Sequence, residues 1–465
     1  MNELTMSLQS NAGSPLYEQI YEYIKQEIQE GHIKSGERLP STRALSKHLE
    51  VSRSTVELSY DQLLSEGYIE SRPQRGFYVA QIDELYHLSK THNEHYDQPL
   101  HKEEDYLYDF TPYGVDLNSF PYSVWRKLSR ESLIDDRAEL FRLGDSQGEE
   151  GLRGAINSYL HSARGVNCEP GQIIVGAGND YLLMLLATII GQNHKVAFEN
   201  PTYKRAYRLM DSLSYGVCTV DMDINGMNIT KLNDSGADIA YVMPSHQYPL
   251  GVVMPIKRRM ELLKWADGQS GRYIIEDDYD SEFRYKGKPI PALQGYDTHE
   301  KVIYIGTFSK SIAPAIRLSY MVLPKPLLAL YKKKSTFLSS TVSKVDQLIM
   351  QKFIEEGYFE RHLNKTRALY KSRHDILLNG LKGLRPQVTI AGENAGVHLI
   401  LHFHNGLSEE EAIARAKEHG IKVYGLSRYY IEAKADETAA VLLGYANMSE
   451  EKIVKAVDIL REIWG

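Results

Sequence analysis

Residues 301–320 read KVIYIGTFSKSIAPAIRLSY. The run after the first lysine is apolar and rich in β-branched residues, which predicts a buried strand. Lys310 then falls where this strand gives way to a loop, among hydroxyl side chains and seven residues before Arg317. Lysines are usually solvated, so one at the end of a buried strand suggests a chemical role.

Apolar runs of the same kind recur along the chain and alternate with helix-like stretches. Continuous apolar strands separated by helices predict a mostly parallel sheet covered on both faces. Ligands of such sheets gather beyond the carboxyl ends of the strands. The runs are 172–178, 195–200, 237–245, 272–280, 301–309 and 317–324, and the polar residues at their ends are Asn179, Tyr203, His246, Asp277 and Lys310.

Composition limits the class of protein. The chain has 465 residues, enough for two or three domains, with 42% hydrophobic and 25% charged residues, as in soluble globular proteins. A net charge of −7 argues against a molecule that binds polyanions with its whole surface. Two cysteines without CxxC spacing argue against a disulfide scaffold or a zinc site. We see no signal peptide and no apolar run long enough for a bilayer, so we expect a cytoplasmic protein with no membrane partner.

The chain falls into three parts by pattern. Residues 1–80 are a helix-rich block, 81–107 a polar linker without sustained periodicity, and 108–465 the strand-and-helix block, with a smaller α+β subdomain from about 365 to 465. The linker holds His87, His92, His95 and His101 at irregular spacing. We therefore predict no metal site there or elsewhere.

The first block has the order of a winged helix-turn-helix. Helices are expected at 15–31, 42–49 and 53–66, followed by two short strands around the turn Pro-Gln-Arg-Gly. The block carries more acids than bases, but its bases gather between positions 34 and 54 and at the wing. A helical hairpin can also be a mere packing unit. Side chains at the start of the third helix that can reach base edges and phosphates are Arg53, Ser54 and Thr55.

The stretch LPSTRALSKHLEVSRSTVELSYDQLLSEGYIESRPQRGFYV resembles the GntR family of bacterial regulators, over about residues 14–80. The resemblance implies a double-stranded DNA operator as partner. It also implies DNA contacts from Arg43, Arg53 and Thr55 and from the wing at Arg75 and Gly76.

The second block offers what pyridoxal phosphate would need. Lys310 can form a Schiff base, and Asp277 can hold a protonated pyridine nitrogen. Asp277 and Tyr279 share one face of an extended segment. Phosphate donors are Thr307, Ser309, Arg317 and the glycine turn Ala177, Gly178 and Asn179, which opens a helix. That turn lacks the GxGxxG spacing of dinucleotide folds. A second aromatic and a second arginine, Tyr203 and Arg205, follow another strand, and His246 lies at the end of a third.

Residues 108–465 resemble a fold-type I aminotransferase domain, and the whole chain resembles the MocR/GabR subfamily of GntR regulators. The motifs are NPTYKRAYR, MPSHQYPLG, YIIEDDYDSEFRY, IPALQ, GTFSKSIAPAIRLSYMVLP and GLSRYY. The resemblance implies pyridoxal 5'-phosphate bound to Lys310 as an internal aldimine. It implies that Asp277 contacts the pyridine nitrogen of the cofactor and that Tyr279 lies near its ring hydroxyl. It also implies that Tyr203 stacks on the ring and that Arg317 binds the phosphate. It also implies that Arg205 and Arg428 clamp an effector carboxylate; the role of Arg428 comes from the resemblance alone.

One motif departs from many aminotransferases, which carry Asn-Pro-Thr-Gly where this chain has YPLG at 248–251. Tyr248 replaces the asparagine that touches the ring hydroxyl, which suits a binder with at most slow or partial transamination. We therefore expect a homodimeric regulator that senses an amine or amino acid, γ-aminobutyrate-like by family likeness, through external aldimine formation. The alternatives are a working aminotransferase with a DNA tether, and a DNA-binding scaffold with an inactive cofactor fold.

Overall fold

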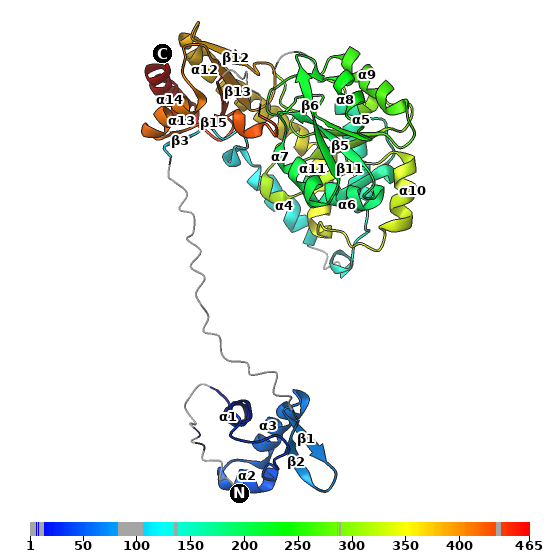
Figure 1. The fold of residues 1–465 in the computed structure, drawn as a ribbon, viewed down its shortest axis with the longest axis vertical. Helices are drawn as coiled ribbons and strands as arrows, with labels where there is room; N and C mark the ends of the chain where they lie inside the picture. Colours follow the sequence, from blue (N-terminus) through cyan, green and yellow to red (C-terminus); the bar gives the residue numbers. More distant parts are fainter. Residues whose placement is uncertain are drawn as a thin grey trace. The chain divides into compact units, whose positions relative to one another are not determined.

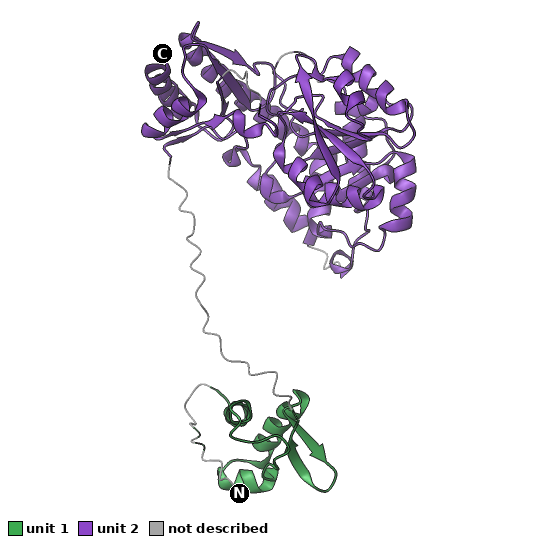
Figure 2. Cartoon of the chain, viewed as in Figure 1, with its two compact units in different colours: residues 1–103 green, residues 104–465 purple. Residues whose placement is uncertain are grey.

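The computed structural model describes residues 6, 8, 14–81, 106–133, 138–285, 287, 290–433 and 439–465. The chain divides into two compact units, residues 1–103 and 104–465 (Figure 2). Most of the predicted linker, with its histidines, lies outside the described residues. Among the helices of the described part, none combines the length and the apolar character needed to cross a bilayer.

The first unit is a three-helix block with a two-stranded wing (Figure 1). Serine hydroxyls begin the second and third helices: Ser41 Oγ accepts from the Ala44 amide, and Ser52 Oγ from the Thr55 amide, each at 3.2 Å. Such caps satisfy amides that the first helical turn leaves unpaired. The elements are α1 (Leu16–Gln29), α2 (Thr42–His48), α3 (Arg53–Ser65), β1 (Ile69–Arg72) and its antiparallel partner β2 (Gly76–Val79).

Helical spacing of apolar residues builds the core of this unit. Ile20 and Ile24 of α1 are fully buried and belong to one cluster with Val56, Tyr60 and Leu63 of α3. The spacing of three or four residues within each helix puts these side chains on one helix face. The predicted winged helix-turn-helix is confirmed.

The second unit is built on an eight-stranded sheet in the order β4-β11-β10-β9-β8-β5-β6-β7. Neighbours among β5, β6, β8, β9 and β10 are parallel, whereas β11 runs antiparallel to both β10 and β4. The predicted mostly parallel sheet is confirmed. The strands are β4 (Ile173–Gly176), β5 (Lys195–Asn200), β6 (Gly216–Asp223), β7 (Gly226–Met227), β8 (Ile239–Val242), β9 (Tyr273–Asp278), β10 (Val302–Thr307) and β11 (Ser319–Val322). The sequence analysis did not predict β6, because a partly exposed strand lacks a continuous apolar run.

Helices cover both faces of this sheet, and strand alternation sorts the side chains between them. Along β9, Ile274 packs toward α8 and α9, while Ile275 packs toward α6, α7 and α10. A third cluster joins the sheet to α4, α5 and α11. The helices are α4 (Tyr122–Leu133), α5 (Glu150–Arg164), α6 (Asn179–Ile190), α7 (Lys204–Ser212), α8 (Ile229–Asp234), α9 (Ile256–Asp267), α10 (Lys325–Lys334) and α11 (Lys344–Glu355).

A smaller α+β subdomain completes the unit, as the sequence predicted. Its four-stranded sheet has the order β12-β13-β16-β15, and β14 pairs in parallel with β3. β3 lies far upstream in the chain, so the first described segment after residue 105 belongs to this subdomain. The elements are β3 (Tyr108–Asp109), α12 (Tyr358–Leu381), β12 (Val388–Ala391), β13 (His398–Phe403), α13 (Glu409–Glu418), β14 (Ile421–Lys422), β15 (Tyr424–Gly425), β16 (Ala440–Gly444) and α14 (Glu450–Trp464).

Short 3-10 helices join these elements. They are η1 (Leu117–Ser119), η2 (Ala138–Phe141), η3 (Pro170–Gln172), η4 (Gln294–Tyr296), η5 (Pro314–Ile316), η6 (Lys382–Leu384) and η7 (Ser427–Tyr429). Of these, η5 ends next to Arg317, and η7 contains Arg428.

Candidate functional site

A cavity of about 140 Å³ lies at the carboxyl ends of the central strands. Side chains that follow β4, β5, β8, β9 and β10 meet there, as expected for an open α/β sheet. The lining residues are Tyr113, Asn179, Asp180, Tyr203, Arg205, Met243, Tyr248, Asp277, Tyr279, Thr307, Ser309, Lys310 and Arg317.

Lys310 is the amine of this cavity. It comes directly after β10, and its Nζ donates to the Pro112 carbonyl at 3.2 Å and lies 5.7 Å from the centre of the Tyr113 ring. Burial lowers the pKa of Lys310 to about 8, against an opposing effect of Asp280. An amine with a depressed pKa keeps a larger neutral, nucleophilic fraction near neutral pH.

Asp277 is the carboxylate of the cavity. The alternation of β9 sends it to the cavity side, while Asp278 points to the other face and accepts from Arg164 Nε at 2.8 Å. Asp277 accepts from the Tyr241 hydroxyl and from Asn179 Nδ2, the latter at 3.3 Å. Burial raises the pKa of Asp277 to about 7, although the Tyr241 hydrogen bond lowers it. Burial therefore disfavours the ionised carboxylate, and a cationic partner in the cavity would stabilise it.

Tyr279 stands beside Asp277 and is backed by a buried histidine. The Tyr279 hydroxyl lies 3.0 Å from His246 Nδ1, which lies 2.9 Å from Asp280 Oδ2. His246 does not line the cavity itself. It was a candidate cofactor contact in the sequence analysis, and the structure gives it a supporting position behind Tyr279.

Arg317 and Asn179, the last residue of the glycine turn, also line the cavity. Arg317 has a left-handed backbone, φ 50°, and its Nη2 donates to the Ala177 carbonyl at 3.2 Å. A Cβ at Gly178, where φ is 98°, would lie 2.2 Å from that nitrogen, so only glycine permits the approach. Thr307 Oγ1 accepts from the Ser309 amide at 3.1 Å, and α6 opens at Asn179. Ala177 and Gly178 are not lining residues, but they hold Arg317 in place.

Of the two arginines predicted to clamp a carboxylate, Arg205 lines the cavity and Arg428 does not. Arg205 Nη2 lies 2.5 Å from Asp180 Oδ2, which also lies 3.6 Å from Arg317 Nη2. Arg428 is exposed and is not a lining residue; its guanidinium lies over the rings of Tyr424 and Tyr429 at 5.3 and 5.9 Å. Asp180 thus pairs with both Arg205 and Arg317 in this structure.

Sequence reasoning missed three lining residues, Tyr113, Asp180 and Met243. Asp180 directly follows Asn179 in the glycine turn, so its position in the first turn of a helix could have pointed to it. Tyr113 comes from the segment after the linker, and no local pattern marks it. Tyr248 was noted as a departure from aminotransferases and now lines the cavity.

The predicted DNA-contacting residues lie on the surface of the first unit. Arg43, Arg53, Ser54 and Arg75 are exposed and Thr55 is half-buried. Arg53 Nε lies 2.8 Å from Glu57 Oε1, and the Ser52 hydroxyl lies 2.8 Å from that of Ser54. Gly76 opens β2 with φ 100°. The start of α3 thus presents a guanidinium and hydroxyls to solvent.

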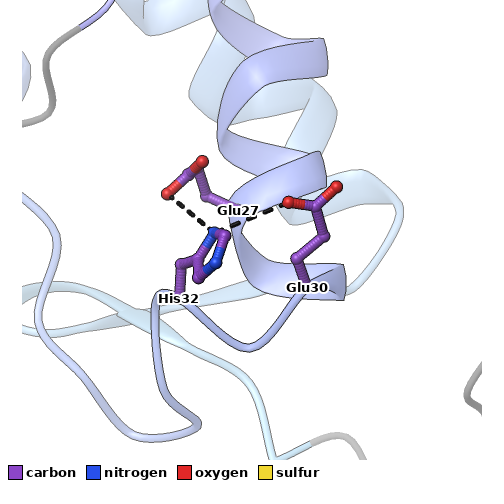
Figure 3. Close-up of side chains that lie close together, drawn as sticks. All are labelled: Glu27, Glu30 and His32. Carbon is purple, nitrogen blue, oxygen red and sulfur yellow. Dashed lines mark ion pairs between the residues drawn. The ribbon is translucent and has the colours of Figure 1, made fainter.

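One further cluster lies at the end of α1. His32 Nδ1 lies 3.4 Å from Glu27 Oε2 and 3.5 Å from Glu30 Oε2 (Figure 3). Figure 3 shows the imidazole between the two carboxylates. These side chains are wholly or partly exposed. We assign this cluster no binding role, because exposed ion pairs of this kind are common on protein surfaces.

Comparisons with known proteins agree with both units. Residues 16–79 match the family model "Bacterial regulatory proteins, gntR family", and residues 113–460 match "Aminotransferase class I and II". The second unit also resembles the solved kynurenine aminotransferase of Pyrococcus horikoshii, with a TM-score of 0.68 and 24% identity, over 78% of this chain and 91% of that one. This likeness shows the fold.

Relatives with both units cover nearly the whole chain. The uncharacterized HTH-type transcriptional regulators YhdI and YdeL of Bacillus subtilis (strain 168) are 40% and 39% identical, over 100% and 99% of this chain and 98% and 99% of theirs. The probable rhizopine catabolism regulatory protein MocR of Rhizobium meliloti is 31% identical, over 98% of this chain and 94% of its own.

The fold and the site therefore define a DNA-binding regulator in which a winged helix-turn-helix is fused to an aminotransferase-like unit. The chain belongs to the MocR subfamily of GntR-family transcriptional regulators.

Proposed function

We propose that this protein regulates transcription from a double-stranded DNA operator in response to an amine or amino acid sensed through pyridoxal phosphate at Lys310. The observation that carries the proposal is the meeting of Lys310, Asp277 and Arg317 in one cavity of a chain that also holds a winged helix-turn-helix. We place such a regulator in the cytoplasm, where the chromosome is.

The class I and II aminotransferase fold typically binds pyridoxal phosphate, and the donor set of the cavity fits that group. Arg317 and the start of α6 offer cationic and amide donors for a phosphate. Asp277 offers a carboxylate for a pyridinium, and Tyr203 an aromatic wall. When bound, pyridoxal phosphate supplies an aldehyde carbon that can exchange the Lys310 amine for the amine of an effector.

The residues of the chain then set what can be sensed. A carboxylate-bearing effector such as γ-aminobutyrate would need Arg205 to leave Asp180, because that guanidinium is already paired. Arg428 would need to move toward the cavity from its place over Tyr424 and Tyr429. An effector that stabilises this rearrangement would bind one arrangement of the subdomains better than the other. Differential binding of this kind is what shifts a conformational equilibrium.

We also propose a homodimer. Large apolar side chains are exposed around α4 and η2, among them Leu117, Tyr122, Leu133, Phe141 and Leu143. Exposed apolar patches mark interaction sites, and a two-fold dimer matches a repeated operator. Sedimentation of the purified full chain measures its mass in solution, and a monomer at micromolar concentration would contradict this part.

The central experiment uses the purified full chain loaded with pyridoxal phosphate. Borohydride reduction followed by peptide mapping should label Lys310. Added amines should change the visible absorbance of the cofactor and the affinity for a duplex selected from a random library. Lys310→Ala should abolish the label and both responses, whereas Lys333→Ala, at an exposed lysine of α10, should keep them.

Three outcomes distinguish the proposed sensor from an aminotransferase and from an inactive scaffold. A label at another residue, or amines that change neither absorbance nor DNA affinity, would refute the sensor. Sustained conversion of an amino acid with a keto-acid acceptor would identify an aminotransferase with a DNA tether. No cofactor uptake at all would leave a DNA-binding scaffold.

A further inference from the structure

The cavity contains a buried hydroxyl that no protein atom satisfies. Tyr248 lines the cavity and is only 4% exposed, and its hydroxyl has no partner at hydrogen-bond distance among the described residues, although the hydroxyls of Tyr113 and Tyr429 lie near enough to add to the rise of its pKa. A buried polar group without a partner costs roughly 1–3 kcal/mol. A protein that keeps such a group in a cavity usually meets it with a ligand or water.

Two other tyrosines surround this hydroxyl. The Tyr113 hydroxyl donates to that of Tyr429 at 3.3 Å. The Tyr248 ring centre lies 5.8 Å from the ring centre of Tyr113 and 5.2 Å from that of Tyr429. Burial raises the pKa of both Tyr248 and Tyr429, so these phenols stay protonated at neutral pH. Tyr113 and Tyr248 line the cavity, and the ring of Tyr429, which is not a lining residue, packs against that of Tyr248.

Several other polar groups in or beside the cavity have protein partners, although Asn179 Oδ1, an acceptor only, has none in the described part of the chain. The Tyr279 hydroxyl lies 3.0 Å from His246 Nδ1, and the Tyr241 hydroxyl donates to Asp277. Arg205 is paired with Asp180. Tyr248 therefore offers an uncommitted donor that is uncharged, and an uncharged donor selects for an oxygen acceptor without requiring a full negative charge.

We propose that Tyr248 is a specificity-determining residue whose hydroxyl binds an oxygen atom carried by the amine effector, with the Tyr113–Tyr429 pair completing the subsite. This inference rests on the proposed function and deepens it. The effector class is a primary amine that bears a hydroxyl or carboxylate oxygen, and a plain alkylamine is disfavoured. A site that leaves a buried donor unpaired rejects the analogue that lacks the acceptor.

The test uses two amines that differ only at their far end. 3-Amino-1-propanol and butylamine have similar length, with a hydroxyl in the first where the second has a methyl group. The half-saturating concentration of each is measured from cofactor absorbance, with the pyridoxal phosphate-loaded full chain and with Tyr248→Phe. We expect the wild type to prefer the amino alcohol. Tyr248→Phe should raise the half-saturating concentration of the amino alcohol by roughly fivefold to tenfold and change that of butylamine little.

A second measurement separates a binding role from a structural one. Since the Tyr248 hydroxyl makes no bond within the protein, Tyr248→Phe should leave the melting temperature of the cofactor-free chain unchanged or higher. The matched control is Tyr215→Phe, whose hydroxyl donates to the carbonyls of Ala187 at 2.8 Å and Gly191 at 2.6 Å away from the cavity. This variant should lose stability and keep the preference between the two amines.

Three results would overturn the inference. If Tyr248→Phe weakens the binding of both amines equally, the hydroxyl acts on the amino group or alkyl chain that both amines have. If it shifts the pH dependence of cofactor absorbance without any amine present, the hydroxyl serves the cofactor ring, where many aminotransferases carry asparagine. If neither amine changes the absorbance of the wild type, the amine-sensing function itself fails, and this subsite with it.

Discussion

The Nζ of Lys310 donates a hydrogen bond to the backbone carbonyl of Pro112 at 3.2 Å. Pro112 lies three residues after β3, which pairs with β14 of the smaller subdomain. The amine at the end of β10 thus contacts the segment that follows the linker. Commitment of Lys310 to a cofactor would break this contact, and release would restore it. One hydrogen bond of Lys310 thus links the end of β10 to the first described segment of the second unit.

The pH dependence of cofactor uptake follows from the environment of Lys310. Burial lowers its pKa to about 8, so the neutral fraction rises about tenfold per pH unit below that value and levels off above it. The initial rate at which the cofactor-free chain takes up pyridoxal phosphate should follow this curve. A free lysine derivative should keep accelerating to higher pH, and Lys310→Gln should show no visible band. A protein rate that does not change between pH 6.5 and 9.5 would contradict the assignment.

Asp277→Asn tests whether the carboxylate of Asp277 holds the pyridinium of the cofactor. Burial raises the pKa of Asp277 to about 7, and a pyridinium partner needs the ionised form. Wild-type affinity for pyridoxal phosphate should therefore fall as the pH drops below about 7, because the carboxyl must then lose a proton to bind. The asparagine variant should bind roughly tenfold or more weakly at pH 8 and lose this part of the pH dependence. Asp211→Asn, at an exposed site, should match the wild type.

Asp180→Asn should expose the arginines that the carboxylate now holds. Asp180 Oδ2 lies 2.5 Å from Arg205 and 3.6 Å from Arg317, and asparagine has a similar shape without the charge. The variant should bind anions more tightly, so inorganic phosphate should raise its melting temperature more than that of the wild type. Asp211→Asn again serves as the control. An equal phosphate effect in both proteins would show that Asp180 does not restrain these arginines.

Glu199→Gln tests how the buried carboxyl of Glu199 makes the folding stability depend on pH. Burial raises the pKa of Glu199 to about 8, whereas the unfolded chain ionises near the ordinary value of a glutamate. As the pH rises between these values, the unfolded state loses its proton first, so ionisation favours unfolding and stability falls. Glutamine carries no such penalty. The melting temperature of the variant, relative to that of the wild type, should rise from pH 5 to pH 8.

The control for this prediction is Glu169→Gln, whose side chain is 74% exposed. It should show a small difference that does not change with pH. Burial also raises the pKa of Glu276 and Glu282 to about 7, but both contribute equally to the wild type and the variant. A constant margin for Glu199→Gln would refute the raised pKa.

Arg53→Ala tests the DNA surface. Arg53 begins α3 and is 65% exposed, so its guanidinium can leave Glu57 for a phosphate or a base edge. Operator affinity should fall roughly tenfold, and wild-type affinity should fall steeply with salt. Arg142→Ala is the matched control, since Arg142 in the second unit is 72% exposed and also ion-paired. Affinity that is insensitive to salt would argue against phosphate contacts.

The sequence predicted the parts of the site that follow from local periodicity. Asp277 and Tyr279 share a face because side chains alternate along a strand, and the strand ends brought Lys310 and Asn179 to one edge of the sheet. The spacing of Ile20 and Ile24, four residues apart, likewise puts both on one face of α1, and that face is buried. These features depend on neighbours a few residues apart.

Only the tertiary structure decided the contacts between distant segments. The Lys310–Pro112 bond spans 198 positions and the Tyr113–Tyr429 bond 316, and both depend on how the smaller subdomain packs against the sheet. The same packing put the Tyr248 hydroxyl in a buried place without a partner and left Arg428 outside the cavity. Local patterns fix which face of an element is buried. They carry no information on which side chains from other elements meet there, because that choice is made by the summed packing of the whole unit.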